Sequence, residues 1–246
     1  MEPVADLACA SSPWIRSTNR LPAMRSLVLQ DDFGIDQLSF TDKVPPSPDA
    51  NRILVRMKAA TINYVDLLLV KGELNPDIKP PFIPLSDGAG IVEAVGENVE
   101  GFSVGDRVVT TYIPKWTGGR YTPENADFTT RPGSSFKPGQ LVEYKTFQPH
   151  EILKLPDALS LNEAATLPIA GVTAWNALNY PNAKPGDTVL LHGTGGVSIF
   201  ALQFAKARGA HVIITSSRDE KLVRARELGA DHGINYATHP DWTGAV

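Results

Sequence analysis

The sequence predicts an α/β protein in which a β-barrel-type region precedes a unit of alternating strands and helices. Up to about residue 150, short runs rich in β-branched residues are bounded by Gly and Pro, which is typical of a β domain. After Pro185-Gly186, strand-length apolar runs alternate with apolar residues at helical spacing. A length of 246 residues accommodates two domains of this kind.

Composition excludes several classes of function. The chain carries 23 basic and 27 acidic side chains, and no basic run could follow a phosphate backbone, so we expect no nucleic-acid partner. No apolar run is long enough to span a bilayer, so we expect no membrane partner. Cys9 is the only cysteine, which excludes cysteine nucleophiles and thiolate-bound metals from residue 10 onward.

Residues 1–23 are predicted to form a disordered extension, because three prolines break any long helix within them. Arg16, Arg20 and, just after this region, Arg25 are consistent with a mitochondrial transit peptide. Glu2 and Asp6 do not fit the acid-poor composition of such peptides. We therefore expect a cytoplasmic protein, with mitochondrial targeting as the alternative.

Residues 24–180 are predicted to form the β domain. The strand candidates are 26–30, 52–58, 90–95 and 106–110. The stretch 116–138 is rich in Gly and Pro and is predicted to be a long loop. A functional loop and a plain surface excursion both remain open for it.

Residues 181–246 are predicted to form the first half of a doubly wound fold. The strand candidates are 188–192, 211–215 and 233–236. Helical spacing follows the first strand, and Ser217 to Glu220 has the Ser-x-x-Glu form of a capping box that would open a second helix. This order of elements is one mononucleotide-binding half of a doubly wound domain.

Gly193, Gly195 and Ser198 occupy the three positions of a G-x-G-x-x-G pattern, with Ser in the last place. The first glycine permits a tight turn, the second lets the backbone approach a pyrophosphate, and the third position needs a small side chain. The helix expected from Gly196 and Val197 would aim free amides at the phosphates. Because the pattern lies between a predicted strand and a predicted helix, we interpret it as a dinucleotide-binding loop.

The choice of cofactor depends on the end of the second strand, where NAD enzymes usually carry a carboxylate. This chain has Ser216, Ser217 and Arg218 there. Two hydroxyls and a guanidinium can bind a 2′-phosphate, which a carboxylate would repel. We therefore expect NADP(H); in the alternative, Ser217 only caps its helix and Arg218 is solvated.

Several segments in the same order resemble the medium-chain dehydrogenase/reductase superfamily. They are 87–96, 105–108, 167–178, 184–189 and the glycine loop. The resemblance covers residue 24 to the end and is strongest to the branch of zinc-type alcohol dehydrogenase-like and quinone oxidoreductase-like proteins. It implies a GroES-like catalytic domain, with the enoyl reductase arrangement, followed by a Rossmann domain.

In zinc-dependent members of this family, a Cys occupies the position of Asn63, and the His of a Gly-His-Glu run occupies the position of Ser86. Asn and Ser are poor zinc ligands, and Asp87 cannot hold a metal alone. The resemblance therefore implies a zinc-free enzyme. A zinc-dependent alcohol dehydrogenase is a weaker alternative.

Without a metal, another group must polarise the substrate oxygen. We expect Tyr64 to donate a hydrogen bond or proton, Asn63 to add an amide donor, and Asp66 to position its neighbours. In the alternative, Tyr64 is a partly buried aromatic and Asp66 a helix-start carboxylate. Thr173 matches a family threonine that lies beside the nicotinamide ring.

After Tyr236 only ten residues remain, so we expect a truncated domain that lacks its second mononucleotide half. The predicted function is hydride transfer between NADP(H) and a small carbonyl, enone or quinone. The alternative is an inactive family member that acts as a binding or interaction module. A homodimer is expected if the complete fold is present.

Overall fold

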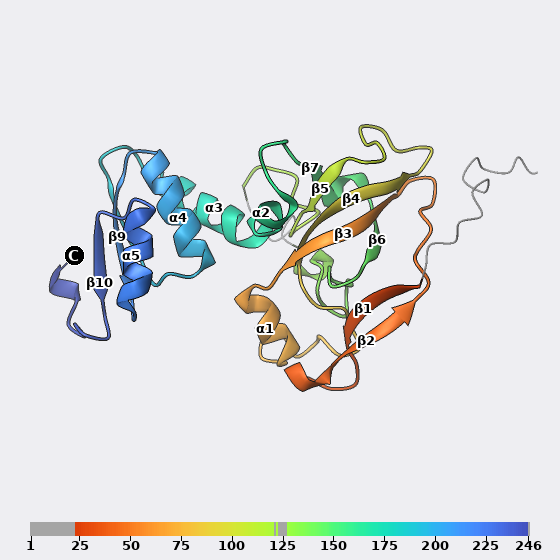
Figure 1. The fold of residues 1–246 in the computed structure, drawn as a ribbon, viewed down its shortest axis with the longest axis horizontal. Coiled ribbons are helices and arrows are strands. Elements are labelled where there is room, and N and C mark those ends of the chain that lie inside the picture. Colours follow the sequence, from red (N-terminus) through yellow and green to blue (C-terminus); the bar gives the residue numbers. More distant parts are fainter. Residues whose placement is uncertain (1–22, 121, 123–126, 246) are drawn as a thin grey trace, which may run out of the picture.

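The structure, a computed structural model, describes residues 23–120, 122 and 127–245. The extension expected over residues 1–23 lies almost wholly outside this range. Figure 1 shows two units, a β-rich unit and a smaller unit of strands and helices. Helices α2 (Leu161–Ala165) and α3 (Val172–Asn179) run between them.

The β-rich unit contains a five-stranded sheet of order β6-β3-β4-β5-β7, in which all neighbours are antiparallel. Its strands are β3 (Ile53–Thr61), β4 (Asp87–Val95), β5 (Arg107–Thr110), β6 (Tyr144–Phe147) and β7 (Ile152–Lys154). A second, antiparallel pair consists of β1 (Met24–Leu29) and β2 (Leu38–Lys43). Single bridges from Ser26 to Val142 and from Leu29 to Phe82 join this pair to the rest of the unit.

The core of this unit follows from alternation along the strands. Ile53 and Val55 on β3 are fully buried and pack with Val92, Val108 and Phe147 from neighbouring strands. All four strands expected from the sequence are present. β4 begins three residues earlier than predicted, because its glycines lie tightly against β3.

Short helices account for most of what the pattern missed. They are α1 (Tyr64–Val70), α2, α3, a π-helical turn η5 (Leu167–Gly171), and the 3₁₀ turns η2 (Ile35–Gln37), η3 (Phe128–Thr130), η4 (Pro149–Glu151) and η6 (Thr243–Ala245). Each is too short to show the helical periodicity from which helices were predicted. Of the stretch 116–138, the described residues contain only η3 and are otherwise irregular.

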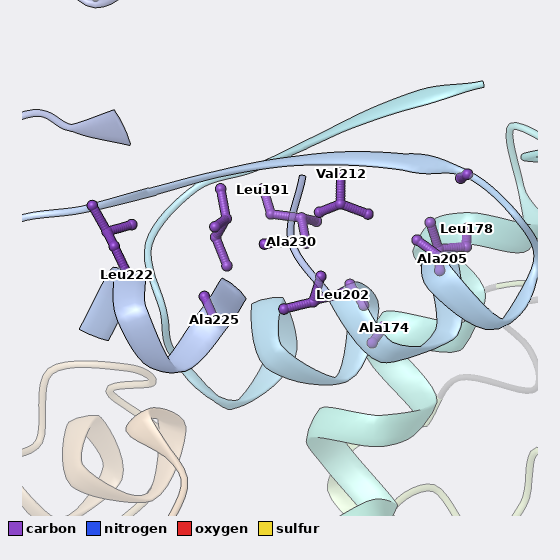
Figure 2. Packing of buried hydrophobic residues seen from close by; sticks show 12 residues of the cluster. Ala174, Leu178, Leu191, Leu202, Ala205, Val212, Leu222, Ala225 and Ala230 are labelled. Atoms are coloured by element: carbon purple, nitrogen blue, oxygen red, sulfur yellow. The ribbon is translucent and has the colours of Figure 1, made fainter. Parts of the chain in front are cut away.

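The second unit is a three-stranded parallel sheet of order β10-β9-β8. Its elements are β8 (Thr188–Leu191), α4 (Gly196–Ala207), β9 (His211–Ser216), α5 (Asp219–Glu227) and β10 (His232–Asn235), as the sequence predicts. Figure 2 shows Leu202 of α4 beneath Val212 of β9, with Leu222 of α5 on the same side of the sheet farther along. The expected boundary at residue 180 stays a prediction, although Ala174 and Leu178 of α3 lie in this core.

The capping box expected at Ser217 is wrong. Arg218 is the extended N-cap residue of α5, and the helix begins at Asp219 without a side-chain cap. The Asp219 carboxylate instead accepts a hydrogen bond from the Asn235 side chain at 2.8 Å. A side-chain contact with Asn235 on β10 is therefore formed at the start of α5 in place of the predicted capping box. The Ser217 hydroxyl does not cap the helix.

No helix in the described part of the chain is both long and apolar enough to cross a bilayer.

Candidate active site

The glycine loop lies at the carboxyl end of β8 and is held in place by hydroxyl groups. The Gly193 amide donates to Thr215 Oγ1 at 3.1 Å, and the Thr194 and Ser216 hydroxyls lie 3.3 Å apart. Ser198 Oγ donates to the His192 carbonyl at 2.9 Å, so the small third residue of the motif fastens the helix to the strand end. These bonds fix the loop from the side of the protein.

The outer side of the loop is open. Gly193 has a φ of +73°, which favours glycine, but Gly195 has an ordinary φ of −77° and ψ of 172°. A Cβ at either position would meet no atom within 4 Å. The fold itself therefore does not require glycine at position 195. A close-approaching ligand does explain it, and the free amides at the start of α4, at Gly196 and Val197, suit a pyrophosphate.

The end of β9 presents two groups to solvent beside this loop. Ser216 is buried and its hydroxyl faces Thr194, so it supports the loop. Ser217 and Arg218 are exposed. Arg218 lies 3.7 Å from Glu220, but both side chains are mostly solvated, so this ion pair is weak and can yield to a ligand.

The turn η5 joins the two units at the site. The Ile169 amide donates to Asp87 Oδ2 on β4 at 3.0 Å. On the other side of the turn, a Cβ at Gly196 would lie 3.6 Å from the Ala170 Cβ, so the start of α4 packs on η5. The residues that begin α3 are thereby anchored both to the β sheet and to the glycine loop.

A pocket of about 710 Å³ lies between the β-rich unit and α3. Most of its wall is apolar, and it is lined by Val109, Thr110, Thr111, Tyr112, Ile113, Trp116, Leu153, Leu167, Pro168, Val172, Thr173, Asn176, Ala177 and Tyr180. Thr173, predicted to lie beside the nicotinamide, is in this wall. A pocket of this size suits a small organic substrate.

A buried polar cluster lies beside η5, where the predicted catalytic residues meet. The Asp66 carboxylate accepts a hydrogen bond from the backbone amide of Asn63 at 2.8 Å. It also accepts hydrogen bonds from the backbone amide of Ser86 at 3.2 Å and from the Ser86 hydroxyl at 3.1 Å. Asn63 Nδ2 donates to Asp87 Oδ2 at 3.0 Å. Asp66 therefore fastens Ser86 and the start of helix α1, and its role beside a catalytic group stays a prediction.

Asp87 is the most unusual ionisable group of this cluster. Its carboxyl is fully buried, and Oδ1 has no hydrogen-bond partner among the described residues. Burial, with a smaller effect from the Asp66 charge, raises the pKa of Asp87 to about 7. Burial also raises the pKa of Asp66, although its hydrogen bonds oppose the shift. No local pattern marks Asp87, because its environment comes from three separate segments.

Tyr64 is not brought into the pocket. It is the first residue of α1, its exposed fraction is 75%, and it does not line the cavity that contains Thr173. Its catalytic role stays a prediction.

Tyr112 lines the pocket instead, and Arg131 Nη1 donates to its hydroxyl at 3.0 Å. Neither residue belongs to a pattern that sequence alone could have identified.

The side chains of this cluster do not form a suitable set of ligands for a catalytic zinc ion. Asn63 and Ser86 are brought close together around Asp66, but both are poor ligands. Both oxygens of Asp66 already accept hydrogen bonds, and Asp87 has one unused oxygen. Over residues 23–120, 122 and 127–245, no three His, Cys, Asp or Glu side chains form a group able to hold a metal.

Comparison with known proteins agrees with both parts of the fold. Residues 49–157 match the family model of the alcohol dehydrogenase GroES-like domain, and residues 196–246 match that of zinc-binding dehydrogenases. A zinc-type alcohol dehydrogenase-like protein of Schizosaccharomyces pombe is 45% identical over 225 residues, which cover 89% of this chain and 64% of that protein. The chain thus spans about two thirds of that relative's length.

Solved structures give the same result. A putative alcohol dehydrogenase from Sinorhizobium meliloti 1021 is 38% identical with a TM-score of 0.81, and the match covers 92% of this chain and 66% of that one. A quinone oxidoreductase from Coxiella burnetii is 29% identical with a TM-score of 0.73, over the same shares of the two chains. An α/β fold with a GroES-like domain and a Rossmann-type sheet is confirmed.

The chain belongs to the medium-chain dehydrogenase/reductase superfamily.

The raised pKa of Asp87 makes stability depend on pH in a defined direction. The unfolded carboxyl ionises near pH 4 and the folded one near pH 7, so its stabilising contribution is complete below pH 4 and is lost as the pH rises to 7. Asp87→Asn removes this titration. We expect the unfolding free energy of the parent, relative to the variant, to fall by up to about 4 kcal/mol across that range.

Chemical unfolding of both proteins at pH 4 to 8 measures this difference. Asp42→Asn, which replaces an exposed carboxyl on β2, serves as the control. The difference in unfolding free energy between this variant and the parent should not change with pH. A flat difference for Asp87→Asn would contradict the burial argument.

Proposed function

We propose that this chain forms the substrate pocket and the first half of the cofactor site of an oxidoreductase that uses NADP(H). It acts on a small, uncharged carbonyl, enone or quinone and needs no catalytic zinc. The observation that carries the proposal is the turn η5, which packs on the open glycine loop and also lines the 710 Å³ pocket. Cofactor and substrate would thereby meet at α3.

The residues that hold the cofactor divide into three groups. The loop at Gly193 and Gly195, with the amides that begin α4, would receive the pyrophosphate. Ser217 and Arg218 would bind the 2′-phosphate, and the Asp219 carboxylate is engaged by Asn235. Thr173 would contact the nicotinamide, which supplies the hydride when bound. The substrate's apolar parts would lie against Val172, Pro168 and the other apolar wall residues.

Zinc independence is supported by the chemistry of the donor set. Several relatives and one family model have zinc in their names, but a name says nothing about which ligands are present in this chain. Asn63, Ser86 and the engaged Asp66 give this chain no three-ligand set there. Catalysis would then depend on hydrogen-bond donors that polarise the substrate oxygen in the partly buried pocket.

Gly195→Ala separates a binding role from a folding role. A Cβ at this position meets nothing in the protein, so we expect the melting temperature to change by no more than about 2 °C. The methyl group would hold a pyrophosphate away from the backbone, so NADPH affinity should fall at least about 10-fold. Calorimetric titration and thermal unfolding measure the two effects.

Gly193→Ala is the matched comparison. Its positive φ means that the same methyl group should also destabilise the protein, by about 1 kcal/mol. An unchanged NADPH affinity in Gly195→Ala would contradict the assignment of the loop.

Arg218→Glu tests the choice of cofactor. Reversing this charge removes a charge-assisted hydrogen bond to the 2′-phosphate and adds repulsion, so NADPH affinity should fall about 10-fold or more. NADH affinity should not fall. Arg224→Glu, which changes an exposed arginine farther along in helix α5, is the control and should change neither affinity. A parent chain that binds NADH more tightly than NADPH would refute the NADP(H) assignment.

Zinc independence predicts two results for the purified chain. Elemental analysis after dialysis against zinc-containing buffer should find well below one zinc ion per chain, because the described residues provide no three-ligand set. Treatment with a strong chelator should leave NADPH affinity unchanged. Stoichiometric retention of zinc that depends on Asp87 would reverse the proposal.

A further inference from the structure

The pocket wall contains a phenol that is held by a buried cation. Arg131, whose exposed fraction is 7%, donates from Nη1 to the Tyr112 hydroxyl at 3.0 Å. A guanidinium has donors only, so the phenol oxygen is the acceptor and its own hydrogen is not used in this bond. Within the described residues, no other hydrogen bond of the Tyr112 hydroxyl is formed. That hydrogen remains available to a ligand.

The arginine makes this phenol a stronger donor. A charged N–H that donates to the phenol oxygen polarises the remaining O–H bond, and the low dielectric of the pocket strengthens the effect. Burial raises the pKa of Tyr112, and the opposing influence of Arg131 does not overcome it. The phenol therefore stays protonated at neutral pH and suits an acceptor oxygen.

The position of the pair in the fold fits contact with the substrate. Tyr112 lines the same pocket as Thr173 on α3. The pair also adjoins the buried polar cluster, because the carbonyl of Pro132, the residue after Arg131, accepts from Ser86 Oγ at 3.0 Å. Figure 1 shows the carboxyl end of β5, which leads into Tyr112, beside the helices that join the two units. Tyr180, the other tyrosine of the wall, is 65% exposed.

Among the described residues that line the pocket around Tyr112, only the two tyrosines are ionisable, and most of the others are aliphatic or aromatic. A charged substrate would leave water for this surface without a partner, at a high cost in free energy. An uncharged molecule with one acceptor oxygen loses little on entry. The pocket thus favours aldehydes, enals and enones with an apolar body.

We infer that Tyr112, supported by Arg131, donates a hydrogen bond to the oxygen of an uncharged aldehyde or enone bound in this pocket. The inference rests on the proposed function and gives Tyr112 the role that the sequence assigned to Tyr64. Arg131 is a positioning residue, because it acts through the phenol.

The test uses 4-(dimethylamino)cinnamaldehyde, whose absorption band moves to longer wavelength when its carbonyl oxygen accepts a hydrogen bond. The parent chain should bind it with such a shift. Tyr112→Phe should lose the shift and bind about 10-fold more weakly, as expected for one buried hydrogen bond to a polarised donor. Tyr144→Phe, which changes a remote tyrosine on β6, is the matched control and should keep both the absorption shift and the affinity of the parent.

Two more variants keep the test independent of folding defects. Tyr64→Phe should retain the shift, because Tyr64 does not line the pocket. Arg131→Lys keeps the positive charge but not the planar fork, so it should give an intermediate shift with Tyr112 intact. Thermal unfolding of each variant identifies any loss of structure.

The inference is overturned if folded Tyr112→Phe keeps the shift, if Tyr64→Phe loses it, or if the parent chain gives no shift. NADPH titration of the parent chain distinguishes the two levels of failure. NADPH binding without an aldehyde shift removes only the role of Tyr112. Loss of both removes the proposed function as well.

Discussion

The hydrogen bond from the Ile169 amide to the buried Asp87 carboxyl is the contact on which the arrangement of the site depends. Asp87 lies at the start of β4 and also holds Asn63, while Ile169 lies in the turn that leads into α3. One carboxyl thus fixes the β sheet, the start of α1 and the approach to α3. Its full burial makes any shift of the turn expensive, because an amide and a carboxyl would lose their partners away from water.

From that anchor, the geometry of the two binding regions follows. The turn packs on Gly196, so the glycine loop has a fixed position relative to α3. The same turn and α3 supply one wall of the pocket, and the chain from Val109 to Ile113 supplies another. A hydride transfer requires donor and acceptor carbon atoms at near contact, and a rigid turn shared by both regions provides that constraint.

Asn63 and Ser86 form a hydrogen-bonded cluster around the buried Asp66 carboxylate. Their bonds fasten the protein to itself. In a metal enzyme, a cation would balance the two buried carboxyls. Here burial raises the pKa of both carboxyls, and that of Asp87 to about 7. Arg131, which lies nearby in the fold, donates a hydrogen bond to the Tyr112 hydroxyl.

The sequence alone determined the parallel strands, the glycine loop and the four β-domain strands, because their signals are local periodicity and turn chemistry. It also indicated the unusual residues at Asn63 and Ser86. Only the tertiary structure identified Asp87, Tyr112 and Arg131, since burial, a shared pocket wall and a cation behind a phenol arise from segments far apart in the chain. The tertiary structure also showed that α5 begins at Asp219, after Ser217. There the Asp219 carboxylate bonds to the Asn235 side chain, and Ser217 does not cap the helix.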